Sequence, residues 1–152
     1  MNRDEVLYQL KTGKAVHSGW LQKAKQIIDG FTINETSTPV ASTECAFGLW
    51  FYTEGQRLCK LRNNSPQSMK SVETLHYNIH EIYQDIYYIY YGGKSKGFFS
   101  SKFGKRKVKE KDIELAKSHY KLMKEATDEL IGEFTRMERR IAVISATEIE
   151  SI

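Results

Sequence analysis

Apolar and small residues recur every three or four positions along most of this chain, which is the spacing of one buried face of an amphipathic helix. The longest such run extends from Ala116 to Ile144 at near-heptad spacing, and shorter runs cover 6–28 and 69–90. Helix faces of this kind are buried by packing against one another. The pattern therefore predicts an all-α fold, a four-helix bundle with room for one extra short helix.

Polar segments separate these runs. Residues 34–43 are mostly polar and predict a connector that ends in a Ser42/Thr43 cap before a second helix over 44–61. Turn residues follow, and Pro66 starts the third helix at a tolerated first-turn position. The tract 82–91 is rich in Tyr and Ile and suits a strand by propensity, but its continuity with the helical pattern predicts helix.

The length of 152 residues fits one domain, 1–152, with a sizeable core. Two cysteines are too few for a disulfide framework. No apolar run of transmembrane length and no secretory signal pattern opens the chain. We therefore expect a cytoplasmic protein with reduced thiols and no membrane span.

The net charge of +4 is unevenly distributed. Residues 92–111 hold eight lysines or arginines and one acid, so this stretch contributes +7 and the rest of the chain −3. This distribution argues against a uniformly basic nucleic-acid binder. Between 92 and 107 the sequence is rich in Gly, Ser, Lys and Phe without periodicity, which predicts a long, flexible loop between the third and fourth helices.

Three histidines and one cysteine form a candidate metal site. His76 and His80 are one helical turn apart and project from the same face, while His17 lies on the apolar stripe of the first helix and Cys45 at the start of the second. Each residue alone is more often an ordinary core residue than a ligand. Together they match tetrahedral zinc, which accepts imidazole nitrogen and thiolate sulfur at roughly 2.0–2.3 Å. Four protein ligands leave no position for catalytic water, so such a site favours a structural or sensing role.

Three short motifs strengthen this interpretation: His17-Ser18-Gly19-Trp20, Cys45-Ala46-Phe47-Gly48-Leu49-Trp50 and His76-Tyr77-Asn78-Ile79-His80. In order and spacing they resemble the chemoreceptor zinc-binding domain family, over roughly residues 3 to 145. The resemblance implies a helical bundle that binds one Zn²⁺ through His17, Cys45, His76 and His80.

The resemblance also carries expectations about function. It implies a sensor that responds to zinc availability or to oxidation of Cys45, including by hypochlorous acid. It further implies a homodimer and signalling to chemotaxis or cyclic-di-GMP machinery through a chemoreceptor or a diguanylate cyclase. Family members are commonly attached to such output regions, and since this sequence contains neither, we expect a stand-alone member whose partner is a separate protein.

Residues beside the predicted ligands have physical roles of their own. Trp20 lies one turn from His17 on the same helix face, and Phe47 and Trp50 are expected to shield the sulfur of Cys45. Gly48 allows a neighbouring helix or the metal site to approach closely, at a cost of about 1 kcal/mol in helix propensity relative to Ala. Plain core packing explains the two tryptophans equally well.

Two kinds of enzyme are alternatives to the sensor. A catalytic zinc site needs an open coordination position and a general base, but the sequence has no His-Glu-x-x-His, and Glu44 is more typical of a solvated cap than of a base. A di-iron carboxylate bundle needs two Glu-x-x-His elements, and only Glu73 to His76 forms one. We therefore expect no enzymatic activity.

The alternative function is a nucleic-acid or anionic-membrane binding module that acts through loop 92–111. There Phe98, Phe99 and Phe103 interleave with lysines, a composition that suits single-stranded nucleic acid or a lipid surface. A solvated loop is the plainer interpretation. His119 is interpreted as a core or boundary histidine, and Cys59 as a structural residue.

Overall fold

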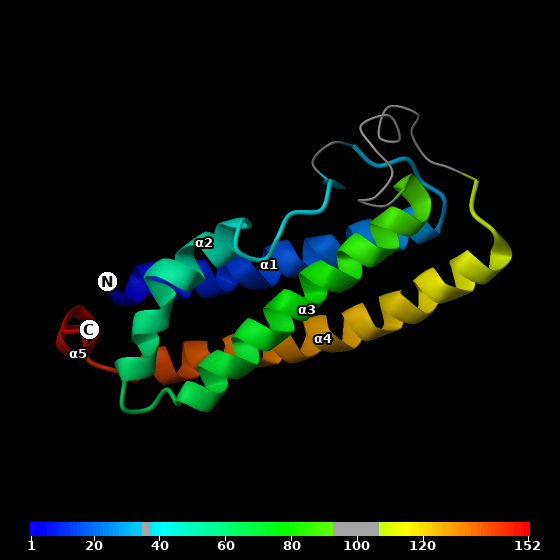
Figure 1. Ribbon diagram of the computed structural model, residues 1–152. Helices are drawn as coiled ribbons and strands as arrows, with labels where there is room; N and C mark the ends of the chain where they lie inside the picture. Colours follow the sequence, from blue (N-terminus) through cyan, green and yellow to red (C-terminus); the bar gives the residue numbers. More distant parts are fainter. Residues whose placement is uncertain (35–36, 93–106) are drawn as a thin grey trace.

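The computed structural model describes residues 1–34, 37–92 and 107–152, and within these ranges the regular structure is entirely helical. Three long helices, α1 (Arg3–Ile28), α3 (Pro66–Tyr91) and α4 (Glu110–Ala142), run side by side (Figure 1). The short helix α2 (Ala46–Thr53) and the 3-10 helix η2 (Gly55–Lys60) occupy the position of a fourth helix near one end of the bundle. The predicted all-α bundle is thereby confirmed.

The ends of the long helices follow the expected capping rules. The Asn2 side chain accepts a hydrogen bond from the Glu5 amide at the start of α1, and the Ser65 hydroxyl accepts one from Ser68 at the start of α3. Pro66 occupies the first turn of α3, as predicted. The tyrosine-rich tract is helical up to Tyr91, and α3 ends at Gly92, whose φ of 93° is the left-handed backbone that favours glycine.

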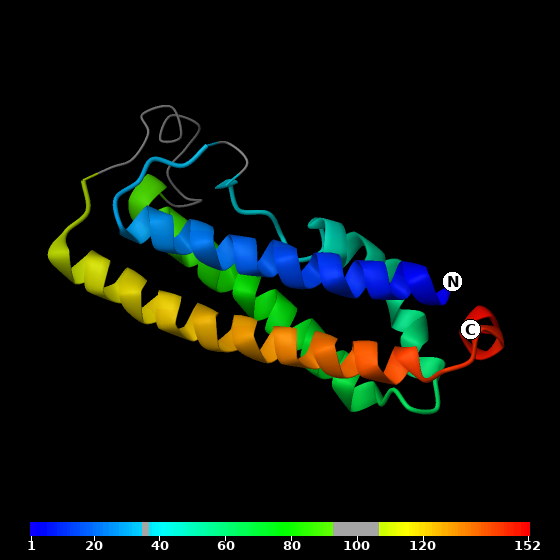
Figure 2. The same ribbon diagram turned by 180° about the vertical axis from the view of Figure 1, so that it is seen from behind.

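One continuous core joins the helices. Apolar residues of α1, α3 and α4 meet along the bundle axis, and the rings of Phe47, Phe51 and Phe134 fill the region where α2 packs on the long helices. Lys14 and Glu138 form an ion pair of 2.6 Å between α1 and α4. Both chain ends lie at the same end of the bundle, where the guanidinium of Arg3 donates to the carbonyl of Ile144 just before α5 (Ala146–Glu150; Figure 2).

The predicted second helix differs from the observed one. A continuous helix over 44–61 is wrong, because α2 ends at Thr53 and the chain continues as 3-10 turns from Gly55. A Cβ atom at Gly55 would lie only 3.1–3.3 Å from the Trp50 ring, so the absence of a side chain there lets the chain turn tightly over Trp50. The expected Ser42/Thr43 cap is also wrong, since the N-cap residue of α2 is Cys45.

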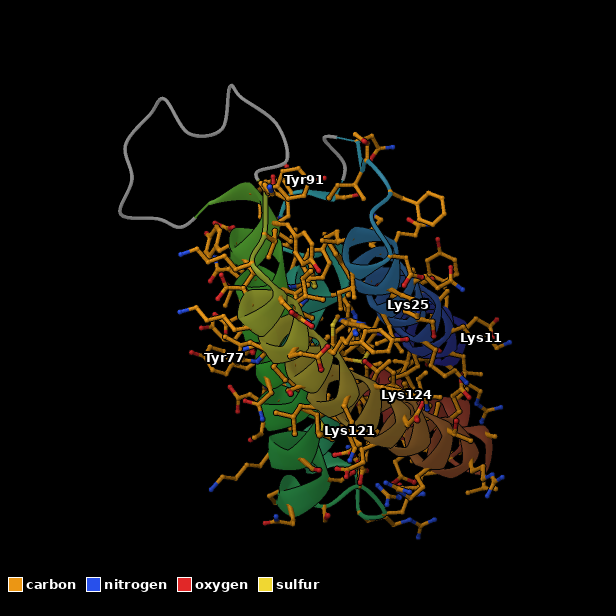
Figure 3. All side chains as sticks on the ribbon, turned by 90° about the vertical axis from the view of Figure 1, so that its right-hand side faces the viewer. Lys11, Lys25, Tyr77, Tyr91, Lys121 and Lys124 are labelled. Carbon is orange, nitrogen blue, oxygen red and sulfur yellow. The ribbon has the colours of Figure 1, made fainter. Side chains whose placement is uncertain are left out.

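The exposed surface is mostly polar along the helices, with lysines of α1 and α4 and Tyr77 of α3 pointing away from the bundle (Figure 3). No helix in the described ranges combines the length and the apolar character needed to cross a membrane. Most of the basic loop 92–111 lies outside the described residues, so its predicted role stays a prediction.

Candidate metal centre

The four predicted ligands meet inside the bundle. One potential ligand atom from each of His17, Cys45, His76 and His80 lies within 4.8 Å of the other three. His17 and His76 are fully buried, and His80 and Cys45 expose only 5% and 6% of their surface. Ligands at ideal tetrahedral zinc are about 3.5 Å apart for bonds of 2.0–2.3 Å, so small side-chain rotations bring this cluster to binding geometry.

Two of the histidines are oriented by backbone carbonyls. His17 Nδ1 lies 2.7 Å from the Gly13 carbonyl oxygen, and His80 Nδ1 lies 2.8 Å from that of Val40. Because a carbonyl can only accept, both Nδ1 atoms carry the proton and donate it, which leaves Nε2 as an unprotonated acceptor. Both Nε2 atoms are buried, and neither has a hydrogen-bond partner among the described residues. This is the arrangement that orients histidine toward a metal ion.

The third histidine lies directly against the sulfur. His76 Nε2 is 3.2 Å from Cys45 Sγ, and the other ring nitrogen, Nδ1, is buried with no hydrogen-bond partner in the described parts of the chain. Cys45 Sγ is 3.6 Å from the Ser42 carbonyl, toward which the thiol points, and it accepts a hydrogen bond of 3.2 Å from the Gly48 amide. As the N-cap residue, Cys45 thus places its sulfur at the positive end of α2, which favours the thiolate.

Burial sets the protonation states of the cluster. It lowers the pKa of His17 to about 4, against the opposing effect of the hydrogen bond to Gly13, and it also lowers the pKa values of His76 and His80. Burial raises the pKa of the Cys45 thiol, although the bond from Gly48 opposes this. At neutral pH the protein alone therefore offers three neutral imidazoles and one thiol, which becomes an anionic ligand by losing a single proton.

Close packing at Gly48 brings α2 onto the cluster. A Cβ atom at this position would lie 1.8 Å from the Ser42 carbonyl oxygen and 3.2 Å from His76 Cε1. Only glycine allows the connector and α3 to approach α2 so closely. The close approach expected at Gly48 from the sequence is what the structure shows.

The aromatic residues of the three motifs have different neighbours. The Phe47 ring packs edge-on against His76 and His17, with centroids 5.1 and 5.8 Å apart. Trp20 is half-buried and lies 6.0 Å from His80 rather than against His17. Trp50 packs on Gly55, and its centroid is 5.8 Å from that of Phe47. Phe47 is therefore the motif aromatic in closest contact with the cluster.

Several residues that matter here were not predicted. The carbonyls of Gly13, Val40 and Ser42 orient ligands, but a backbone acceptor has no residue-type signature in a sequence. The ring of Phe134 on α4 lies 6.4 Å from His17. Tyr52 lies beside His76 with nearly parallel rings, and its position four residues after Gly48 could have indicated this, because such residues share a helix face.

The other candidates lie outside the cluster. His119 is half-buried on α4, and Cys59 is exposed on η2. Glu44 is exposed, and its carboxylate accepts a hydrogen bond of 3.3 Å from the Ala41 amide, which is the behaviour of a local cap. Glu73 of the single Glu-x-x-His element is also exposed.

Buried histidine and cysteine side chains that converge inside a helical bundle are a ligand set that can hold a metal ion. Residues 17–87 match the model of the chemoreceptor zinc-binding domain family, the family that the three motifs resemble. The matched span contains all four residues of the cluster and supports zinc binding by this chain. No curated protein and no solved structure matches the chain.

Proposed function

We propose that the chain binds one zinc ion through His17, Cys45, His76 and His80 and acts as a sensory domain without enzymatic activity. The observation that carries the proposal is the convergence of two unpartnered, backbone-oriented Nε2 atoms with His76 and the Cys45 sulfur. Four protein ligands fill the tetrahedral coordination of zinc, so no position is left for a reacting water.

Native mass spectrometry of the protein purified without added metal tests this proposal. We expect one zinc per chain in the wild type and weakened or lost zinc in Cys45→Ala and His76→Ala. His119→Ala and Cys59→Ala are matched controls, because both residues lie outside the cluster, and they should retain the metal. Zinc that is absent from the wild type, or that is retained in both cluster variants, would contradict the proposal.

Cys45 is the ligand through which the site responds to oxidants. Bound zinc supplies the positive charge that holds a cysteine as thiolate, the nucleophilic form. The Cys45 thiolate and hypochlorous acid give the sulfenic acid and chloride: sulfur loses two electrons, chlorine gains them, and a sulfur–oxygen bond replaces the oxygen–chlorine bond. The sulfenic acid is a poorer zinc ligand than the thiolate, so oxidation breaks the link through zinc between Cys45 and the three histidines. A falling zinc supply breaks the same link by emptying the site.

The proposed signal is the release of α2. His17 belongs to α1 and His76 and His80 belong to α3, whereas Cys45 is the one cluster residue that caps α2. Oxidation of the sulfur therefore frees α2 while zinc still joins the histidines of α1 and α3, and loss of zinc frees α2 as well.

Hydrogen exchange of the α2 amides tests this release. Removing zinc with a chelator should increase exchange in the wild type and not in Cys45→Ser, because serine keeps an N-cap oxygen but lacks the sulfur ligand from the start. Unchanged α2 exchange after zinc removal from the wild type would contradict the proposed signal.

The family supports the remaining parts of the proposal. We infer a homodimer in the bacterial cytoplasm, where thiols stay reduced, and output through a chemoreceptor or a diguanylate cyclase. Sedimentation equilibrium should show a dimer. Zinc-dependent binding to a purified receptor signalling region or cyclase would identify the output, and binding that is indifferent to zinc would contradict it.

A further inference from the structure

Tyr52 is the outermost residue of the α2 face that covers the cluster. Cys45, Gly48 and Tyr52 follow one another at spacings of three and four, which places them on one face of the helix. Cys45 and Gly48 are buried, and His76 of α3 lies against both. Tyr52 is only half-buried, so it is the residue of this face that solvent reaches.

The contacts of Tyr52 extend across the Cys45 side of the cluster. Its ring lies at 30° to the His76 ring with centroids 6.4 Å apart, and it packs edge-on against Phe51 at 5.3 Å. Burial raises the pKa of its hydroxyl, and the neighbouring Ser42 side chain opposes this shift. The Ser42 carbonyl is in turn the group toward which the Cys45 thiol points. Tyr52 thus packs beside the histidine that contacts the sulfur, with its hydroxyl near Ser42 of the connector.

The other rings at the cluster have different positions. Phe47 and Phe134 are core residues that lie against His17 from α2 and α4, and removing either would open the bundle itself. Trp20 is half-buried like Tyr52, but it lies against His80. Tyr52 instead lies against His76, the histidine in contact with the sulfur.

We propose that the Tyr52 ring is a gate that controls the access of small reagents to the Cys45 sulfur. Movement of this one side chain uncovers the sulfur edge of the cluster without unpacking α1, α3 and α4. The gate sets how fast oxidants, alkylating agents or chelators reach the site, and it leaves the equilibrium affinity for zinc nearly unchanged. The measurement of zinc transfer rests on the proposed function, whereas the measurement of Cys45 alkylation in the metal-free protein does not.

Alkylation of the metal-free protein by iodoacetamide tests the gate, with Cys59→Ala as background so that Cys45 is the only thiol. Tyr52→Ala should react about tenfold faster, equivalent to lowering the free energy of local opening by about 1.4 kcal/mol. Tyr52→Phe keeps the ring and should react at nearly the wild-type rate. Tyr77→Ala is the matched control, because Tyr77 adjoins His76 in sequence but is 51% exposed and points away from the bundle (Figure 3).

Equal alkylation rates in Tyr52→Ala and Tyr77→Ala would overturn the proposal, as would a Tyr52→Phe variant that reacts as fast as Tyr52→Ala. If Tyr52→Ala does not fold, Tyr52→Leu decides: faster alkylation supports the gate and an unchanged rate overturns it. In zinc-loaded protein, transfer of zinc to a coloured chelator should accelerate in Tyr52→Ala with little change in Kd. A wild type that holds no zinc contradicts the proposed function alone, while unchanged transfer rates in a zinc-binding protein contradict the gate alone.

Discussion

The most specific structural prediction concerns two glycines in helices, Gly48 and Gly19. A Cβ atom at Gly48 would lie 1.8 Å from the Ser42 carbonyl oxygen, whereas a Cβ atom at Gly19 would have no described atom within 4 Å apart from its own stretch of helix. Cβ atoms essentially never lie within 3.0 Å of a heavy atom from another part of a protein. In Gly48→Ala the new Cβ atom and the Ser42 carbonyl oxygen must therefore separate by at least about 1.2 Å. The atom that must move is backbone, and it belongs to the connector that positions Cys45.

The magnitude follows from two opposing effects. Alanine in place of glycine in a helix gains about 1 kcal/mol in propensity, and this is the whole expected effect of Gly19→Ala. Overpacking costs 1–3 kcal/mol and more where backbone must shift, so Gly48→Ala should be destabilised by a net amount of about 2 kcal/mol. The two substitutions are chemically identical, yet their unfolding free energies should differ by about 3 kcal/mol.

Urea unfolding of the metal-free proteins, followed by helical circular dichroism, measures this difference. A zinc competition assay on the same proteins should show weaker binding only in Gly48→Ala, because the shift displaces Ser42 and the Gly48 amide away from the Cys45 sulfur. A Gly48→Ala variant as stable as Gly19→Ala, with unchanged zinc affinity, would refute the described packing of α2 on the cluster.

Three further predictions concern protonation and packing. The metal-free protein should lose stability as pH falls from about 6.5 toward 4, because histidines of the unfolded chain are protonated in this window while folded His17, with its pKa lowered to about 4, is not. By pH 4, His17 alone accounts for about 3 kcal/mol of this loss. Equal stabilities in urea unfolding at about pH 7.5 and about pH 5 would contradict this prediction. Zinc binding at pH 7 should release about one proton, which comes from Cys45 and not from the histidines. Calorimetry in two buffers of different ionisation enthalpy measures this number, and a release near zero or near three would contradict the prediction. Phe134→Ala should lower the unfolding free energy by about 3–5 kcal/mol because this ring is fully buried. Leu122 is exposed, so Leu122→Ala should change it by less than about 0.5 kcal/mol, and similar losses in both variants would contradict the described core.

Much of this fold could be predicted because helical periodicity is a local property. The buried stripes of α1, α3 and α4 follow directly from spacing, and the placement of His76 and His80 on one face needs only the helix repeat. The extent of α2 could not be predicted in this way. Its end depends on the packing of Gly55 against the Trp50 ring, a contact that the spacing of apolar residues does not reveal.

The candidate site was predictable in its side chains and not in its backbone. Cysteine is not a preferred N-cap residue, so capping rules favoured Ser42 or Thr43, but the structure places Cys45 at the cap with its sulfur on the Gly48 amide. The bond from His80 to the Val40 carbonyl depends on the path of the connector across α3. No residue type marks such an acceptor in the sequence.

Zinc K-edge X-ray absorption of the purified wild-type protein tests the central claim most directly. Coordination by His17, Cys45, His76 and His80 predicts three nitrogen neighbours at about 2.0 Å and one sulfur at about 2.3 Å. The sulfur contribution should disappear in Cys45→Ser and persist in Cys59→Ser. A wild-type spectrum without sulfur, or one with an added oxygen in place of a histidine, would contradict a closed site built from these four residues.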